Sequence, residues 1–157
     1  MGIIKEYILV NPNNIEIVMR CEDGIVKLSD GSTLKLKISI VDTREAGFSP
    51  FGGVNIAVKV VGGVATLEVP EEIRKKVSEK PLAPPEPPHN GWKILDIINY
   101  IPAYEEKPIK TSKGSFLVIV KAEPVMASGN FDYRTELGEP LYWLNWVYKI
   151  SWKPIEG

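Results

Sequence analysis

The chain has 157 residues, a formal net charge of -1 at pH 7 and 44% hydrophobic residues. These values are typical of a soluble globular domain and exclude a disordered chain, which combines low hydrophobicity with high net charge. One cysteine, Cys21, and one histidine, His89, exclude an internal disulfide, a cysteine-based zinc site and any site that needs two imidazoles. Residues 1–6 carry charges where a signal peptide needs an apolar run, and no apolar stretch is long enough to span a membrane. We therefore expect a cytoplasmic protein.

The composition also hints at the source. The chain has no glutamine, and Lys and Glu dominate its charged residues. Depletion of thermolabile residues together with Lys/Glu enrichment is the trend reported for hyperthermophiles. We therefore expect a thermophilic protein.

Residues 15–20 and 34–40 alternate between apolar and polar side chains, which predicts strands with one buried face. A two-residue turn at Asp30-Gly31 would put the apolar faces of the strands on either side out of phase. A three-residue loop, Ser29-Asp30-Gly31, places Val26 opposite Leu34 and keeps the apolar side chains on one face. We therefore predict this loop, with Gly31 at positive φ.

The most unusual segment is an aromatic loop, residues 46–53, in which two phenylalanines lie among three glycines and a proline. Loops on a rigid scaffold often carry binding residues, so its side chains are one candidate contact site for a ligand or partner. The alternative is that the phenylalanines plug the end of the fold. The candidate residues are Phe48, Phe51, Gly52 and Gly53.

Residues 56–60 and 65–69 alternate in the same way, and Gly62-Gly63 lies between them. A two-residue turn at the glycines opposes Val60 to Ala65, which makes each facing pair apolar. We therefore predict a second hairpin with its turn at Gly62-Gly63.

A short helix follows at about 70–80, where a proline precedes two glutamates. Five prolines then occupy residues 81–88, which favour polyproline II and forbid a helix. We call this segment the proline strap. We interpret it as a strap that crosses the surface of a single domain, 1–157; the alternative is a soft seam at 80–91 between two sub-domains.

Three further segments complete the fold. Residues 92–101 fit either a strand or a helical stripe, and we predict a strand; residues 116–120 read as a strand buried on both faces. Residues 141–152 form a long strand with an aromatic stripe on one face. Together the elements predict a mainly β fold, an antiparallel β-sandwich or partly open β-barrel built from hairpins.

The long strand also carries apolar residues on its other face, where Trp143 lies beside Asn145. These two residues are our second candidate contact site. A strand that is apolar on one face and half-apolar on the other has more surface to bury than one small sheet covers, and aromatic residues are enriched in interface cores. We expect self-association, with a two-fold dimer favoured; the alternative is that the proline strap covers Trp143.

Lys27, Lys35 and Lys37 share the outward face of the first hairpin, where they could contact phosphates. Lysines on an exposed strand also prevent edge-to-edge aggregation. The slightly negative net charge argues against nucleic-acid binding.

No motif for nucleotide binding occurs, and the acidic residues match no metal loop, so no cofactor, metal or catalytic residue is assigned. We therefore expect a non-catalytic, thermostable binding or assembly module of unknown ligand. The alternative is a small enzyme acting on a sugar or another polar small molecule, and the third reading is a nucleic-acid-binding protein.

Overall fold

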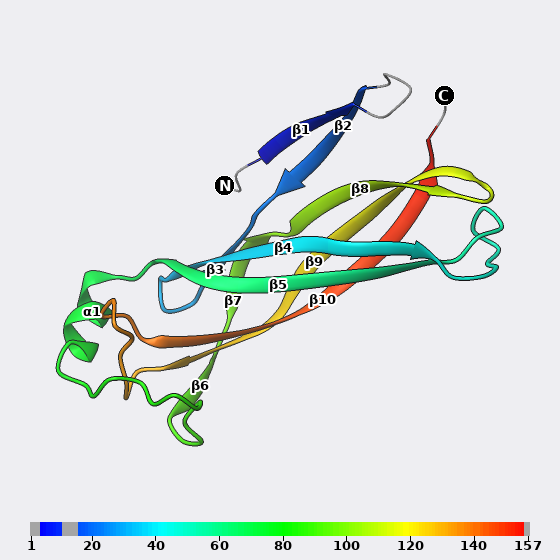
Figure 1. Cartoon of the computed structure of the whole chain (residues 1–157). Coiled ribbons are helices and arrows are strands. Elements are labelled where there is room, and N and C mark those ends of the chain that lie inside the picture. Colours follow the sequence, from blue (N-terminus) through cyan, green and yellow to red (C-terminus); the bar gives the residue numbers. More distant parts are fainter. Residues whose placement is uncertain (1–3, 11–15, 156–157) are drawn as a thin grey trace.

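The computed structural model describes residues 4–10 and 16–155, which form ten strands and one helix in two packed antiparallel sheets (Figure 1). The mainly β, sandwich-like fold predicted from the sequence is confirmed, and among these residues neither sheet closes into a barrel. The elements are β1 (Ile4–Val10), β2 (Glu16–Glu22), β3 (Gly24–Leu28), β4 (Thr33–Glu45), β5 (Ile56–Glu68), α1 (Glu71–Val77), β6 (Trp92–Leu95), β7 (Ile97–Ile101), β8 (Ala103–Thr111), β9 (Gly114–Asn130) and β10 (Leu141–Pro154).

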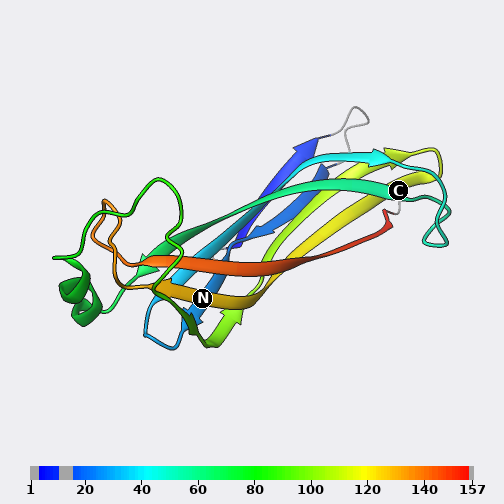
Figure 2. The same ribbon diagram turned by 90° about the horizontal axis from the view of Figure 1, so that it is seen from below.

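Sheet A has the strand order β1-β2-β8-β9-β10, with β6 also paired to β9, and sheet B has the order β5-β4-β3-β7. The long strands β4, β5, β9 and β10 run the length of an elongated molecule (Figure 2). At one end lie α1 and the loops around it, and at the other lie the aromatic loop and the β8–β9 hairpin. The core fills the space between the sheets and includes Val26, Leu34, Leu36, Val118 and Val120, all with no exposed surface.

Two stretches of chain cross together from one sheet to the other. β2 pairs with β8 in sheet A through Cys21 and Glu105, and after the turn β3 pairs with β7 in sheet B through Ile25 and Ile101. Gly24 allows this crossing, because a Cβ there would lie 2.8 Å from the backbone nitrogen of Ala103. Strands that switch sheets form the corners of a sandwich.

The first hairpin has the predicted register. Val26 lies opposite Leu34, the backbone nitrogens of Leu28 and Gly31 close the loop through hydrogen bonds, and Gly31 has φ 91°. Asp30 in this loop accepts a hydrogen bond of 2.7 Å from the hydroxyl of Tyr142 on β10. The loop therefore also ties sheet B to sheet A.

The predicted turn at Gly62-Gly63 is wrong. β5 runs straight through both glycines, with Gly62 opposite Ile38 and Gly63 opposite Lys37 of β4. Gly62 lets the side chain of Trp146 on β10 lie close to the backbone of β5, because a Cβ at position 62 would lie 2.7 Å from the Trp146 ring. Glycine in a strand often marks such a close contact rather than a turn.

The helix predicted at about 70–80 is present as α1. Residues 92–101 are in strands, as predicted, but they form two strands and not one. α1 buries Val77 completely. Residues 92–95 form β6 in sheet A and residues 97–101 form β7 in sheet B, so the chain changes sheets at Asp96. Of the proline strap, Ala83 donates a hydrogen bond of 2.8 Å to the carbonyl of Arg134.

Of the two C-terminal strands, β10 has the predicted alternation, whereas β9, which we predicted to be buried on both faces, is fully buried on one face only. In β9, Phe116, Val118 and Val120 are buried, whereas Leu117 and Ile119 on the other face are half-buried. In β10 the inward stripe includes Leu144, which is buried, and Trp146, which packs against the core. Further along the same face, Tyr148 and Ile150 stay 36% and 41% exposed, and β10 is the edge strand of its sheet.

The described helix, α1, has seven residues, whereas a membrane-spanning helix needs about 20. Within the described residues, no helix can cross a membrane.

Candidate functional site

Trp143 lies on the outer face of sheet A, where the strand pairing brings apolar side chains from three strands together. Trp143 on β10 and Ile94 on β6 flank the same β9 residue, Ser128, from opposite sides. One step along, Asn145 lies opposite Met126. Side chains in neighbouring strands that share a face lie about 5 Å apart.

A β-bulge in β9 enlarges this surface. The register shifts between Asn145 and Trp146, so Val125 has no direct partner on β10, and its side chain is 51% exposed. We call the resulting surface the Trp143 face. Its apolar members are Ile94, Val125, Met126, Trp143 and Val147, each 47–74% exposed, and Ser128 and Asn145 lie between them.

An ion pair borders the Trp143 face on β9 and β10. The ammonium of Lys149 lies 2.9 Å from the carboxylate of Glu123, the residue directly opposite Val147. The apolar surface therefore has charged side chains on this border, and a polar border around apolar residues is common in protein interfaces.

The proline strap covers Trp143 only in part. Trp143 makes an edge-to-face contact of 6.4 Å with the ring of Trp92, whose indole nitrogen donates a hydrogen bond of 2.7 Å to the carbonyl of Pro88. Both rings line a groove of about 290 Å³, together with four prolines of the strap. Trp143 nevertheless remains 58% exposed.

The aromatic loop does not plug the fold with its phenylalanines. Phe48 is 78% exposed and Phe51 is 72% exposed, whereas Val54 is fully buried and fills the end of the core. Gly52 has φ 82° and lies against the ring of Phe116, where a Cβ would approach to 2.7 Å. Gly53, with φ 80°, lies near the side chain of Lys113.

Internal hydrogen bonds hold this loop in shape. The hydroxyl of Ser49 donates to the carbonyl of Val54 at 2.6 Å, and the indole of Trp152 donates to the carbonyl of Phe51 at 3.0 Å. The rings of Phe51 and Trp152 also meet edge to face at 6.5 Å. These contacts hold Phe51 in place, and the loop that carries it lies at the opposite end of the molecule from α1 (Figure 1).

The three lysines of the first hairpin do not share one environment. The ammonium of Lys35 lies 3.1 Å from Asp23, which is buried at the crossing of the sheets. Lys27 is exposed beside β7. Lys37 is also exposed, and it lines a cavity between β2, β4 and β8. Because the ammonium of Lys35 neutralises a buried carboxylate, little of its positive charge is left for a phosphate.

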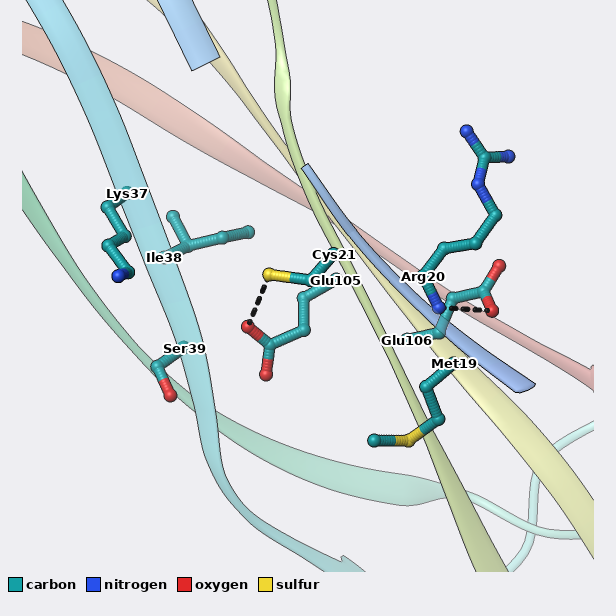
Figure 3. Close-up of a pocket in the computed structure, with 8 residues that line it drawn as sticks. All are labelled: Met19, Arg20, Cys21, Lys37, Ile38, Ser39, Glu105 and Glu106. Carbon is teal, nitrogen blue, oxygen red and sulfur yellow. Dashed lines mark hydrogen bonds between the residues drawn. The ribbon is translucent and has the colours of Figure 1, made fainter. Parts of the chain in front are cut away.

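That cavity, of about 250 Å³, contains two adjacent glutamates, Glu105 and Glu106 (Figure 3). Successive residues of a strand point to opposite faces, and Figure 3 shows the two carboxylates on opposite sides of β8. Glu105 accepts a hydrogen bond of 3.0 Å from the backbone nitrogen of Ile40 and lies 3.9 Å from the sulfur of Cys21. Acid–base hydrolysis of a glycoside requires two carboxylates that flank one bond of the substrate, and these two do not face a common point.

The carboxylate of Glu106 accepts hydrogen bonds from Tyr104 and from the backbone of β2. It accepts a hydrogen bond of 2.5 Å from the hydroxyl of Tyr104 and one of 3.3 Å from the backbone nitrogen of Arg20. Burial, followed by the hydrogen bond to Glu106, raises the pKa of Tyr104 to about 12. The guanidinium of Arg20 lies 5.1 Å above the Tyr104 ring, a cation–π contact that fixes β2 against β8.

Comparison of the chain with protein-family models, with curated proteins and with solved structures finds no significant match. In the part of the chain that the structure describes, no three His, Cys, Asp or Glu side chains lie together as a metal site would need.

Sequence reasoning found Trp143 and Asn145 but missed Ile94, Val125 and Met126, which complete the Trp143 face. The strands that carry them lie far apart in sequence, and their alignment depends on the pairing of β6 with β9. The exposed dipeptide Val125-Met126 after Pro124 was a signal in principle, because proline within a strand often accompanies a bulge.

Proposed function

We propose that this chain is a non-catalytic binding or assembly module that self-associates through the Trp143 face. The observation that carries the proposal is the gathering of five large apolar side chains, each 47–74% exposed, on one outer sheet face. Together they leave roughly 500–600 Å² of apolar surface in water, the upper end of what an ordinary monomer exposes.

The area and anatomy of this face suit a second copy of the chain. A standard interface buries about 800 Å² on each partner, and the exposed apolar side chains would supply the larger part of that area. In a two-fold contact the same patch lies on both subunits, so the apolar side chains of one copy would pack against those of the other. Two sheet faces pack about 10 Å apart, a distance that interdigitated Trp and Ile side chains fill.

The test compares the sedimentation of the parent chain with that of two variants. Trp143→Ser removes the central side chain, whereas Leu67→Ser removes an apolar side chain of similar exposure from the outer face of sheet B. We expect the parent and Leu67→Ser to associate with the same affinity and Trp143→Ser to dissociate at least tenfold more readily. A parent that stays at 17.5 kDa at millimolar concentration contradicts the proposal.

We further propose that residues 1–157 form one thermostable domain of the cytoplasm. Core residues from both sides of the proline strap, such as Leu34 and Val118, pack in the same cluster, which supports one cooperative unit. A single cysteine suits a reducing compartment. We expect one unfolding transition, with a midpoint above the 45–65 °C range that is common for mesophilic domains; two separated transitions, or a midpoint within that range, would contradict this proposal.

A further inference from the structure

A cavity of about 480 Å³ lies at the α1 end of the molecule, apart from the Trp143 face. We call it the lysine cavity, because three lysines from three separate segments line it. Lys76 comes from α1, Lys80 from the segment between α1 and the proline strap, and Lys93 from β6. The rest of the lining is Ile73, Phe131 and Asp132.

The helix that carries Lys76 is fixed to the body of the protein. Val77, the next residue, is fully buried. The guanidinium of Arg74 lies 3.2 Å from the carboxylate of Glu139, which is itself buried. Lys76 therefore projects from an anchored element.

The backbones of the other two lysines are fixed as well. The carbonyl of Lys80 accepts a hydrogen bond of 3.0 Å from the guanidinium of Arg134. Lys93 pairs with Gly129 in sheet A, and its carbonyl accepts a hydrogen bond of 2.9 Å from the hydroxyl of Ser128. Fixed backbones lower the entropy that must be lost when the side chains close on a ligand.

A buried asparagine organises the opposite wall. Asn130 has no exposed surface; its side-chain oxygen accepts a hydrogen bond of 3.0 Å from the backbone nitrogen of Asp132, and its amide donates one of 2.9 Å to the carbonyl of Asn90. Gly91, with φ 90°, leaves room for the Asp132 carboxylate, which a Cβ would meet. The ring of Phe131 is held edge to face against Tyr142 at 6.3 Å.

The charge of the lysine cavity is out of keeping with the chain as a whole. Three lysines and one aspartate give it a net charge of about +2, whereas the whole chain carries -1. Among the described side chains, the ion pairs involve other residues and leave these three ammonium groups to solvent. A charge of +2 matches a dianion, and lysine is a common partner of phosphate.

The apolar part of the lining sets the rest of the ligand. Ile73 and Phe131 offer a hydrophobic and aromatic surface beside the ammonium groups. The volume lies within the 300–1,000 Å³ range of small-molecule sites. We infer that the lysine cavity binds a small organic phosphate, a phosphate dianion attached to an aromatic or apolar group.

The test is an NMR titration of the full chain at physiological salt with three probes: AMP, inorganic phosphate and adenosine. We expect AMP to give saturable shifts at the amides of Phe131 and Asp132, and to bind more tightly than either inorganic phosphate or adenosine. No saturable shift at millimolar AMP would overturn the inference. So would inorganic phosphate binding as tightly as AMP, since the apolar wall would then contribute nothing.

Matched variants separate this site from general attraction to a basic surface. Lys80→Ala should weaken AMP binding about tenfold, because it removes one charge-assisted contact. Lys75→Ala also removes one positive charge, from α1 but outside the cavity, so it should leave the affinity unchanged. Asp132→Asn should strengthen binding, because it removes the one carboxylate. Equal losses in both lysine variants, or weaker binding in Asp132→Asn, would overturn the inference.

Discussion

The two glycines at the centre of β5 should respond in opposite ways to the same substitution. Gly62→Ala places a methyl group 2.7 Å from both the Trp146 ring and the Tyr148 hydroxyl, closer than any real Cβ contact. Overpacking of this kind costs about 1–3 kcal/mol of unfolding free energy. Gly63→Ala meets no atom within 4 Å and needs no positive φ, so it should be neutral or stabilise by up to about 1 kcal/mol, because alanine restricts the unfolded chain.

Denaturant unfolding of the parent and the two variants measures both effects. A type I′ turn at these glycines would instead require positive φ at both, and each alanine would then cost about 1–2 kcal/mol. Equal destabilisation by Gly62→Ala and Gly63→Ala would therefore refute the continuous strand. An unchanged midpoint for Gly62→Ala would refute the close approach of β10.

Three more predictions concern the corners and turns. Gly31→Val should destabilise by about 1–2 kcal/mol, because φ is 91° and a Cβ would lie 2.9 Å from Pro70; a denaturant midpoint equal to the parent's would show the turn assignment to be wrong. Lys35→Met should cost about 2–3 kcal/mol, because it leaves the buried carboxylate of Asp23 without its counter-charge; calorimetry showing less than about 0.5 kcal/mol would refute the ion pair's role. The Tyr104 pKa is raised to about 12, so the stability it contributes is complete below about pH 10 and is lost as the pH rises through about 12; Tyr104→Phe should flatten the alkaline limb of melting temperature against pH, and an unchanged limb would contradict the assignment.

Alternation of apolar side chains was enough to predict the local pairing of the sandwich. The opposition of Val26 to Leu34 follows from keeping two apolar faces in phase, and the loop at Gly31 follows from that register. The same reasoning failed at Gly62-Gly63, because it took Ala65 and Leu67 as core-facing, whereas both lie exposed on the outer face of one continuous strand. The deciding contact, with Trp146, comes from a strand more than 80 residues away in sequence.

β8 shows a second limit. Its sequence, with Glu105, Glu106, Lys107 and Pro108 in a row, has low strand propensity, and sequence reasoning did not single it out. It forms a strand because the hairpin after it aligns nine residue pairs with β9. Tertiary pairing therefore overrides local preference here.

The candidate sites divide along the same line. Phe48, Phe51 and Trp143 could be named from sequence because aromatic residues in a loop or on the polar side of a strand are conspicuous. Their surroundings could not be predicted. The members of the Trp143 face come from β6, β9 and β10, and those of the lysine cavity come from α1, the segment that follows it, β6 and the segment after β9. Such groupings depend on how sheets and helix pack, which a one-dimensional pattern does not encode.

The most direct test of self-association through the Trp143 face is fluorine NMR of the chain labelled with 5-fluorotryptophan, recorded over a dilution series. The chain has four tryptophans, so four signals are expected, and Trp143→Phe assigns the one that matters. The account predicts that the Trp143 signal shifts with concentration, while that of Trp152, at the far end of β10, stays constant. Four signals that do not change with concentration, or a shift confined to Trp152, would contradict it.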